Sequence, residues 1–481
     1  MLLYRSSAAR AVQAPGLDGA ADEVLRRCGV GDGQPFVLGP DGAYDLNLNR
    51  FLRELDGWGV RSAHTVVAYA RDLMLFARFL HERRGGRSLW RADQGDLRAY
   101  RRARRHTPGF EVSAATWNRF LAALDKWVEW ALYERLLTER PFRMVERTVL
   151  TGRGLARVVV NAEREVDDES APVRFLPYVD YLLWRDVGLR GLLPDGGPDP
   201  GWRGRHGRRN AAFADLLVCT GMRLGEASSL LLPEVPAADG RAMTGAVQLA
   251  SAVTKRNRAR TVFVTRRVLH ELHHWVEMER DELVTRKTAA GAYDDVADRV
   301  PVRSAGRMAL TMAGRGGSRP YARITVGERR RLHRVDADGG AGGPLWLWLG
   351  ENGLPLSAST WQAVFCRANE RCARFGLQVR AHPHTLRHTF AVHMLGLLLR
   401  QTVRALRREP GETLMSQQVK RQLVGDPLRK LQLLLGHRHR ETTFAYLDVL
   451  DEAQAIVLAA LHDWDEQAEA LTRVRAEDDE R

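Results

Sequence analysis

Two short stretches of this 481-residue chain carry the residue types that bond-breaking chemistry needs. The first holds His384, Arg387 and His388, and a helix would place them on one face because Arg387 and His388 lie three and four residues after His384. The second holds His437, nine positions before Tyr446. Arginine offers a planar fork of donors that fits phosphate, and imidazole donates a bond or moves a proton near neutral pH. With tyrosine as a nucleophile, these types predict a site that binds and attacks an anion.

The overall charge indicates the kind of partner. Lysine and arginine total 73 against 59 acidic residues, a formal net charge of +14, which favours a polyanion such as double-stranded DNA, although a GC-rich genome also raises arginine content. The four cysteines form no CxxC pair, which argues against a disulfide framework and a zinc ribbon. No apolar run reaches the roughly 18 residues of a membrane span. We therefore expect a soluble, cytoplasmic protein without membrane contact.

Residues 46–142 repeat apolar side chains at three- and four-residue steps, which predicts a small helical domain. We expect Trp117, Trp127 and Trp130 to be core residues rather than a platform for stacked bases. A basic stripe lies between the apolar runs, and given the net charge we favour contact with backbone phosphates over a merely solvated face. The stripe comprises Arg98, Arg101, Arg102, Arg104 and Arg105.

A second domain is expected to hold the reactive residues. Residues 210–219 and 224–231 read as helices joined by a turn in which Gly221 takes positive φ, so Arg223 lies near a helix N-terminus that favours anions. Two strands, a basic hairpin tip, a further strand and two further helices follow. The two strands are expected at 246–253 and 261–264, with the basic tip at 255–258 between them, and the further strand at 345–349. The helices are expected at 361–375 and, as an amphipathic tail helix, at 452–472, with extra helix between 393 and 431.

Domain boundaries follow from shifts in composition and periodicity. The first 44 residues read as a loosely ordered arm or a disordered tail, and one short helix is expected from residue 22 to 28. Residues from about 283 to 343 are glycine-rich and basic, which predicts an insertion or a long loop over the second domain. The predicted parts are an arm at 1–44, a helical domain at 45–145, a linker at 146–175, a second domain at 176–465 with insertions at about 283–343 and 397–428, and a tail at 466–481.

The motifs, in order and type, resemble the tyrosine recombinases of the phage-integrase family. The resemblance covers residues 46–465 and rests on Thr220-Gly221-x-Arg223-x-x-Glu226, Lys255, His384-x-x-Arg387-His388, Leu435-Gly436-His437 and Tyr446. It implies a mainly helical fold with a small β-sheet: a helical, SAM-like core-binding domain plus an α+β catalytic domain, forming a C-shaped clamp on DNA. The gaps from Lys255 to His384 and from Arg387 to His437 are longer than is usual in the family.

The resemblance also implies roles for individual residues. Arg223 and Arg387 would bind the scissile phosphate with His437, Tyr446 would attack it, His384 would accept the phenol proton, and Lys255 would protonate the leaving oxygen. Glu226 and His388 would orient the arginines and histidines. DNA contacts are expected from the helical domain and from the hairpin tip, at Arg98, Arg101, Arg102, Arg105, Asn118, Arg119, Arg256 and Arg258.

By the same resemblance the protein is a site-specific recombinase of a mobile element or prophage in the bacterial nucleoid. It would act through a 3′-phosphotyrosyl link and a Holliday junction, as a homotetramer on DNA, with no metal or nucleotide cofactor. Accessory or partner recombinases are a further expected class of partner.

Three alternatives stay open at this point. The crowded histidines between residues 382 and 393 could belong to a metal-dependent hydrolase, although they form no HExxH motif among themselves. A type IB topoisomerase uses related chemistry. A DNA-binding accessory factor that depends on another recombinase comes from a different class, and the intact Arg223, Arg387 and Tyr446 argue against it.

Overall fold

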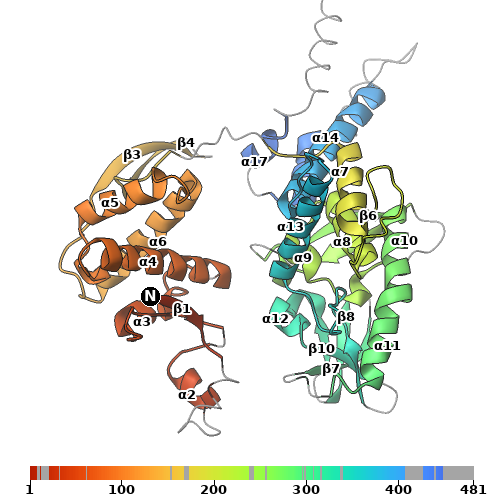
Figure 1. Ribbon diagram of the computed structural model, residues 1–481, viewed down its shortest axis with the longest axis horizontal. Coiled ribbons are helices and arrows are strands. Elements are labelled where there is room, and N and C mark those ends of the chain that lie inside the picture. Colours follow the sequence, from red (N-terminus) through yellow and green to blue (C-terminus); the bar gives the residue numbers. More distant parts are fainter. Residues whose placement is uncertain are drawn as a thin grey trace, which may run out of the picture. The chain divides into compact units, whose positions relative to one another are not determined.

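The structure is a computed structural model in which the chain forms two compact units, residues 1–171 and 172–481. Figure 1 traces both units in colours that follow the sequence. The residues that it describes are 1–7, 11, 21–31, 33–60, 62–151, 154–166, 173–237, 243–254, 257–294, 296, 299–306, 308–314, 317–335, 340–406, 426–437 and 440–447.

Unit 1 is the predicted helical domain. Its longest helices, α4 and α6, pack against each other, and Ser113 begins α6 by accepting a bond from the Thr116 amide. Asp93 and Asp96 form a capping box at the start of α5. The elements are β1 (Leu2–Arg5), α2 (Ala21–Arg27), β2 (Pro35–Leu38), α3 (Leu46–Glu54), α4 (Ala63–Arg83), η1 (Leu89–Arg91), α5 (Gln94–Arg105), α6 (Ala114–Tyr133), β3 (Met144–Thr151) and β4 (Gly154–Asn161).

The tryptophans of unit 1 are core residues, as predicted. Trp117, Trp127 and Trp130 are each at most 1% exposed. Each lies among other rings, and the Trp130 ring is 5.5 Å from that of Phe51. These side chains join α3, α4 and α6 into one core, so they are not available for stacking on bases.

The expectation of a loosely ordered arm over residues 1–44 was wrong for its described parts. Strands β1 and β2 pair antiparallel, with Leu3 opposite Val37. The buried Val37 is tied to α3 through Asn49, whose side chain accepts from the Val37 amide at 2.7 Å and donates to its carbonyl at 2.9 Å. This ribbon therefore belongs to the fold of unit 1, and the short helix predicted for residues 22–28 is confirmed as α2.

The predicted linker over 146–175 was also wrong for most of its length. Strands β3 and β4 form a hairpin that pairs residue by residue from Met144 with Asn161 to Thr151 with Gly154. The chain then returns to the helices, where the Trp117 indole donates to the Glu163 carbonyl at 2.9 Å. The described positions of this hairpin from Met144 to Val160 are all partly or fully exposed, so no alternation of buried apolar and exposed polar residues marked its strands in the sequence.

Unit 2 contains the remaining elements. They are α7 (Tyr178–Trp184), η2 (Arg185–Arg190), α8 (Gly207–Thr220), α9 (Leu224–Ser228), η3 (Leu232–Glu234), β5 (Thr244–Leu249), η4 (Ser251–Val253), β6 (Arg260–Thr265), α10 (Arg266–Trp275), η5 (Val276–Arg280), α11 (Asp281–Ala289), β7 (Val300–Ala305), β8 (Ala309–Met312), β9 (Ser318–Pro320), η7 (Tyr321–Arg323), α12 (Val326–Arg329), β10 (Leu332–Val335), β11 (Ala341–Pro344), α13 (Ala358–Arg374), α14 (Pro383–Leu406), α16 (Pro427–Leu435) and α17 (Glu441–Phe444).

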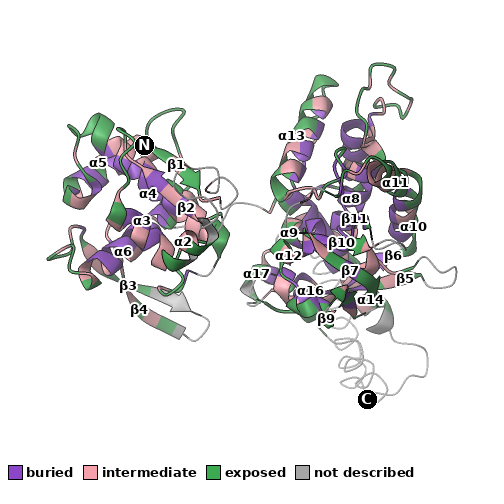
Figure 2. Cartoon of the chain, turned by 90° about the horizontal axis from the view of Figure 1, so that it is seen from below, coloured by how far each residue is buried: buried purple, intermediate pink, exposed green. Residues whose placement is uncertain are grey.

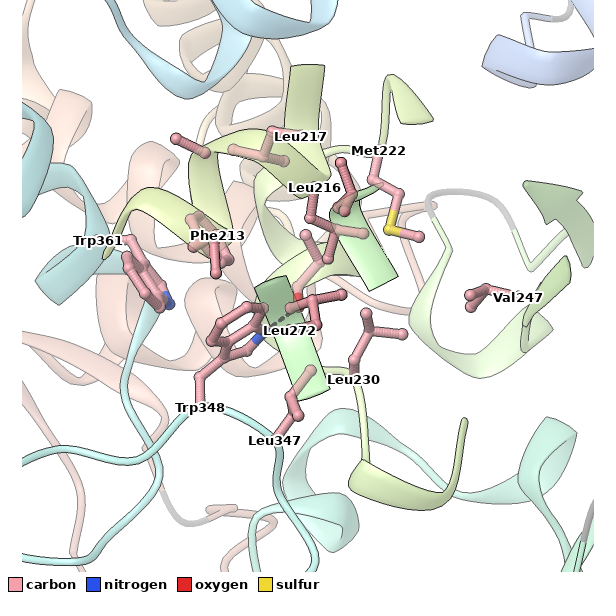
Figure 3. Packing of buried hydrophobic residues seen from close by; sticks show 14 of the residues in the cluster. Phe213, Leu216, Leu217, Met222, Leu230, Val247, Leu272, Leu347, Trp348 and Trp361 are labelled. Carbon is pink, nitrogen blue, oxygen red and sulfur yellow. Dashed lines mark hydrogen bonds between the residues drawn. The ribbon is translucent and has the colours of Figure 1, made fainter. Parts of the chain in front are cut away.

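Helix α8 runs through the core of unit 2. Figure 3 shows its Phe213, Leu216 and Leu217 among side chains from several other elements. Phe213 stacks on Trp361 with ring centroids 3.6 Å apart, and the Trp348 indole donates to the Ala227 carbonyl at 2.8 Å. Burying side chains of this size contributes about 1.5–3 kcal/mol each. This packing holds both ends of α8 in place, and the reactive residues begin at its C-terminal end.

The stretch over 283–343 is not a long loop. It contains the end of α11 and a five-stranded sheet in the order β11-β10-β7-β8-β9, with β10 parallel to β7 and the other neighbours antiparallel. We call it the inserted sheet; Figure 1 shows it at the end of unit 2 away from α17. The expected strand at 345–349 forms only isolated bridges, such as Leu231 with Trp346, although its residues are buried.

Each unit has its own buried core. Figure 2 shows buried residues along the inner faces of the helices in each unit and exposed residues on the outer faces. Within the described residues no helix is long and apolar enough to cross a membrane. The predicted tail helix at 452–472, and most of the second insertion at 397–428, lie outside the described residues, whereas α14 supplies the extra helix expected after residue 393 as far as Leu406.

Candidate active site

The turn after α8 places the first arginine. Gly221 ends the helix at φ +62°, as predicted, and an added Cβ would meet the Phe390 ring at 2.3 Å. Glycine is therefore required both by the backbone angle and by the close approach of α14. Arg223 follows as the N-cap of α9, and its amide donates to the Glu226 carboxylate at 2.8 Å. The turn thus aims a half-exposed guanidinium from a helix N-terminus.

Arg387 holds two elements of the site together. It lies on α14 and is 2% exposed. Its guanidinium donates to the carbonyl of Gly221 and, at 2.6 Å, to the carbonyl of Leu435 at the end of α16. Burial lowers the pKa of Arg387 to about 10, with Arg223 acting in the same direction. The group stays charged at neutral pH, so the centre of the site carries a desolvated positive charge.

Sequence reasoning missed Arg260, the first residue of β6. It donates to both oxygens of Glu226, at 2.9 and 2.6 Å, and to the Leu434 carbonyl at 3.1 Å. Glu226 is 1% exposed, so it is a buried carboxylate held between Arg260 and Arg223. Hydrogen bonds and charge from Arg260 lower the pKa of Glu226 despite the opposing effect of burial. The only sequence signal was its position at the start of a strand after a basic tip.

Replacing Arg260 with glutamine should remove one side of this buried cluster. We expect the free energy of unfolding to fall by about 3 kcal/mol, because Glu226 keeps its charge but loses its closest partner. Chemical denaturation measures this change, and the rate of covalent DNA attachment should fall with it because Glu226, which holds Arg223, is no longer fixed by Arg260. Arg258→Gln is the matched control, since Arg258 is exposed two residues away. An equal loss of stability in both variants would contradict the assignment.

Tyr446 is enclosed by two histidines. It is 2% exposed and its oxygen lies 3.0 Å from Nδ1 of His388. The His437 ring stacks beside the phenol at 6.2 Å, and His384 packs on His388 at 4.2 Å between centroids. The structure thus gives the direct contact with the phenol to His388, which we had expected only to orient other groups, whereas His384 was the expected acceptor. Burial raises the pKa of Tyr446, and Arg387 and Arg223 partly oppose that effect.

His437 follows the C-cap of α16. Gly436 adopts φ +66° there, and the His437 amide then bonds to the Gln432 carbonyl at 3.1 Å. Its Nδ1 lies 3.1 Å from the hydroxyl of Thr443, which is 1% exposed. This fixes the imidazole plane, so Thr443, like Arg260, belongs to the site.

Both histidines should make folding stability depend on pH. Burial lowers the pKa of His388 and of His437 from 6.5 to about 4, with Arg387 adding to the effect in each. Between these values the unfolded chain binds more protons than the folded one, so the free energy of unfolding should be constant above pH 6.5 and fall as the pH drops towards 4. Denaturant titrations at pH 7.5 and 5.0 measure the difference.

A His388→Asn variant should lose part of that pH dependence. His270→Asn, at an exposed position on α10, is the control and should behave as the wild type. A wild-type stability that is equal at the two pH values, or that rises on acidification, would contradict this account.

The structure therefore brings together most of the predicted catalytic residues. They are Arg223, Glu226, His384, Arg387, His388, His437 and Tyr446. They lie on α14, at the start of α9 and just after α16 and α17, and all four helices belong to one unit (Figure 2). The hairpin of β5 and β6 is confirmed, but Lys255 and Arg256 at its tip lie outside the described residues. The cluster can bind a tetrahedral anion beside a tyrosine.

Comparisons with known families agree with this geometry. The pattern of the family described as "Phage integrase, N-terminal SAM-like domain" matches residues 48–135, and that of the "Phage integrase family" matches residues 203–397. The second match contains the Gly221 turn and the His384 segment. The chain belongs to the phage integrase family. It is therefore a tyrosine-type site-specific recombinase, an enzyme that cleaves and rejoins DNA, with a SAM-like helical domain and an integrase catalytic domain.

Several solved structures resemble this recombinase. A XerA recombinase is 15% identical, with 86% of this chain and 97% of that chain covered, at a TM-score of 0.32. The Tn1549 transposon integrase with circular intermediate DNA is 13% identical, covering 86% and 99%, at 0.44. A lambda integrase dimer on a COC′ core site is 15% identical, covering 83% and 75%, at 0.41. These scores are too low to add to the family assignment. No curated protein matched the sequence significantly.

Several arginines of the basic stripe form ion pairs within the protein, which the sequence had not led us to expect. Arg98 and Arg101 pair with Glu163 at 3.2 and 2.9 Å, and Arg105 pairs with Glu165 at 2.6 Å. These ion pairs attach the segment after β4 to α5. Sequence periodicity did not reveal them because Glu163 and Glu165 are some 60 residues from their partners. Contact of these arginines with phosphate stays a prediction.

Among the remaining residues predicted to contact DNA, some bond within unit 1 and others are exposed. Asn118 is buried and donates to the Glu165 carbonyl at 2.9 Å, while Arg119 binds both oxygens of Asp72 at 2.9 and 3.0 Å. Arg102 and Arg258 are exposed. Asn118 and Arg119 therefore have structural bonds within unit 1, whereas Arg102 and Arg258 keep their side chains in solvent.

Proposed function

We propose that this recombinase integrates or excises a mobile element or prophage in the bacterial nucleoid. The observation that carries the proposal is the cluster of Arg223, Arg387, His388 and His437 around Tyr446. The net charge of +14 supports duplex DNA as the substrate. Both units are proposed to bind the duplex.

The two arginines are proposed to bind the non-bridging oxygens of the scissile phosphate. Arg387 uses two of its five N–H groups on the Gly221 and Leu435 carbonyls, which fixes the plane in which the others point. Arg223 is 30% exposed and is steadied by Glu226. Two fixed guanidiniums neutralise the charge that builds on phosphorus in the transition state, and no reorganisation is needed at that moment.

Tyr446 is proposed to attack the phosphorus and form a 3′-phosphotyrosyl link. A phenol with a raised pKa is a weak nucleophile, so it needs a proton acceptor. His388, neutral above its pKa of about 4, lies at hydrogen-bond distance, with His384 packed behind it. We propose that His388 accepts the phenol proton and that His384 positions it. The approach of a phosphate raises the basicity of both rings by its charge.

Departure of the 5′ oxygen requires a proton, which we propose comes from Lys255 on the hairpin between β5 and β6. His437 would donate to the phosphate from the ring nitrogen that does not face Thr443. The phosphotyrosyl link conserves the energy of the broken ester, so a 5′ hydroxyl of a second duplex can restore it. Exchange of one pair of strands gives a Holliday junction held by four protomers, and exchange of the second pair completes recombination.

The proposal is tested by strand exchange on the DNA that the enzyme itself selects. The enzyme is incubated with two labelled duplexes carrying that site, and products are separated on native and denaturing gels. We expect four-way junctions, recombinant strands and a complex of four protomers by analytical ultracentrifugation. Relaxation of any supercoiled plasmid without junctions would favour a topoisomerase. Binding without cleavage, restored by a second recombinase, would favour an accessory role.

A further inference from the structure

A cavity of about 550 Å³ opens in unit 2 away from the active site. Its walls are the loop after η2, the first turn of α8 and the outer face of α13. Figure 2 shows α13 on the side of unit 2 opposite α14, α16 and α17. Helix α8 has 14 residues, so at about 1.5 Å per residue the cavity lies roughly 20 Å from Arg223. None of its lining residues belongs to the catalytic cluster.

The lining of this cavity is strongly cationic. It contains a single acidic residue, Glu370. Against it stand six arginines from all three walls, which are Arg203, Arg205, Arg209, Arg367, Arg371 and Arg374. A cavity with this ratio focuses positive potential and selects a ligand with several negative charges.

Most of these arginines have no acidic partner in the part of the chain that the structure describes. Arg205 pairs with Glu351, and Arg371 pairs with Asp199 at 2.6 Å. Arg203 donates only to carbonyls, including that of Pro200 at 2.9 Å. Arg203, Arg367 and Arg374 are exposed, whereas Arg209 is buried, and a desolvated charge without a charged partner is costly to maintain. A ligand anion would supply that partner.

Arg209 shows this cost most clearly. It is 5% exposed, and its guanidinium donates to the Leu349 carbonyl at 2.7 Å and to the Asn210 amide oxygen, both neutral acceptors. Within the described residues no carboxylate lies within ion-pair distance of it. Arg209 therefore places a fixed positive charge behind the cavity wall.

The cavity is formed before any ligand arrives. Trp202 is clasped by its own loop: a Cβ added at Gly191 or Gly204 would lie 2.2 or 2.1 Å from the indole. The Arg371 guanidinium lies 4.8 Å from the centre of the same ring. Since the indole faces are occupied, Trp202 fixes the loop rather than stacking on a base. Because this wall is already rigid, the protein loses less conformational entropy when a ligand binds.

The start of α8 adds to the positive potential. Its N-cap, His206, makes no side-chain bond to the first-turn amides, and both His206 and Asn210 line the cavity. Free amides and the helix dipole favour an anion at this end. The helix terminus and the arginines therefore act on the same space.

We infer that this cavity binds a small molecule carrying two or more phosphate groups. Its volume is within the range of about 300–1,000 Å³ usual for ligand sites, and guanidinium forks match phosphate oxygens. A single carboxylate would compensate only one of the four arginines that have no acidic partner, Arg203, Arg209, Arg367 and Arg374. The inference goes beyond the recombination function and does not depend on it.

Calorimetric titration of the full chain at about 150 mM salt tests the inference, because nonspecific surface binding is screened there. The probes are inorganic triphosphate, ATP and citrate, and the variant is Arg367→Ala/Arg374→Ala, both at exposed positions. We expect triphosphate or ATP to bind the wild type and to bind this variant at least tenfold more weakly. If triphosphate and ATP bind the wild type with equal affinity, the phosphate chain is the recognised group. If ATP binds more tightly than triphosphate, the nucleoside is recognised as well.

The matched control is Arg303→Ala/Arg334→Ala, which removes the same charge from exposed positions of the inserted sheet. It should leave both affinities unchanged. The inference is overturned if neither phosphate probe binds the wild type, if citrate binds as tightly as triphosphate, or if both double variants lose affinity equally. It is also overturned if the Arg367/Arg374 variant weakens only duplex DNA binding, which would make the cavity part of a DNA surface.

Discussion

Tyr446→Phe should abolish covalent attachment of the protein to DNA. Phenylalanine keeps the ring in its buried position beside His437 but has no oxygen to attack phosphorus. We expect a loss beyond the detection limit and a decrease in stability of about 1 kcal/mol, because His388 Nδ1 loses its partner. Denaturing recovery of the protein from producing cells, followed by sequencing of the retained DNA, measures the attachment.

The control for this experiment is Tyr178→Phe, a change at a half-exposed tyrosine of the same unit. It should retain as much DNA as the wild type, and native binding of duplex DNA should survive in both variants. Covalent DNA that persists in Tyr446→Phe would remove Tyr446 as the nucleophile. The sequences retained by the wild type also supply the site for the strand-exchange assay.

Arg387→Lys should lower the rate of cleavage by roughly 100- to 1,000-fold, the range for losing a fixed donor to a transition-state oxyanion. Lysine keeps the charge but has no planar fork, so it cannot reach the Gly221 and Leu435 carbonyls and the phosphate together. Each carbonyl left without a donor costs about 1–3 kcal/mol, so the free energy of unfolding should also fall. Single-turnover cleavage of a nicked site and chemical denaturation measure the two effects.

Arg380→Lys is the matched control because Arg380 is exposed just before α14. It should change neither rate nor stability. If Arg387→Lys lost stability but cleaved at the wild-type rate, Arg387 would be a structural residue that joins α14 to α16. A loss of rate at unchanged stability would instead contradict the bridging role described above.

The catalytic cluster could be predicted from the sequence because its residues occur in short motifs. His384, Arg387 and His388 share a helix face by spacing alone, and the positive φ of Gly221 follows from a glycine at a helix end. Such features depend on residues a few positions apart. The helical core of unit 1, with Trp117, Trp127 and Trp130, could also be predicted because helical periodicity depends on residues three or four positions apart.

Contacts between distant parts of the chain could not be read in this way. Arg260 meets Glu226 across 34 residues, and Arg101 meets Glu163 across 62. The same basic residues look like a free DNA-binding stripe until the returning segment supplies carboxylates. The inserted sheet was missed because its strands are only three to six residues long, too short for an alternating pattern to stand out in the sequence.

The sequence by itself determined the family, the order of the two domains and the set of groups that meet at the site, because these are encoded in local motifs and helical periodicity. Only the tertiary structure decided that His388 rather than His384 contacts the buried phenol, and that Arg260 supports Glu226. Two imidazoles four residues apart on one helix are equivalent in sequence. The packing of α17 against α16, and of Tyr446 among side chains of α14 and α16, distinguishes them, since it fixes which ring the Tyr446 oxygen can reach.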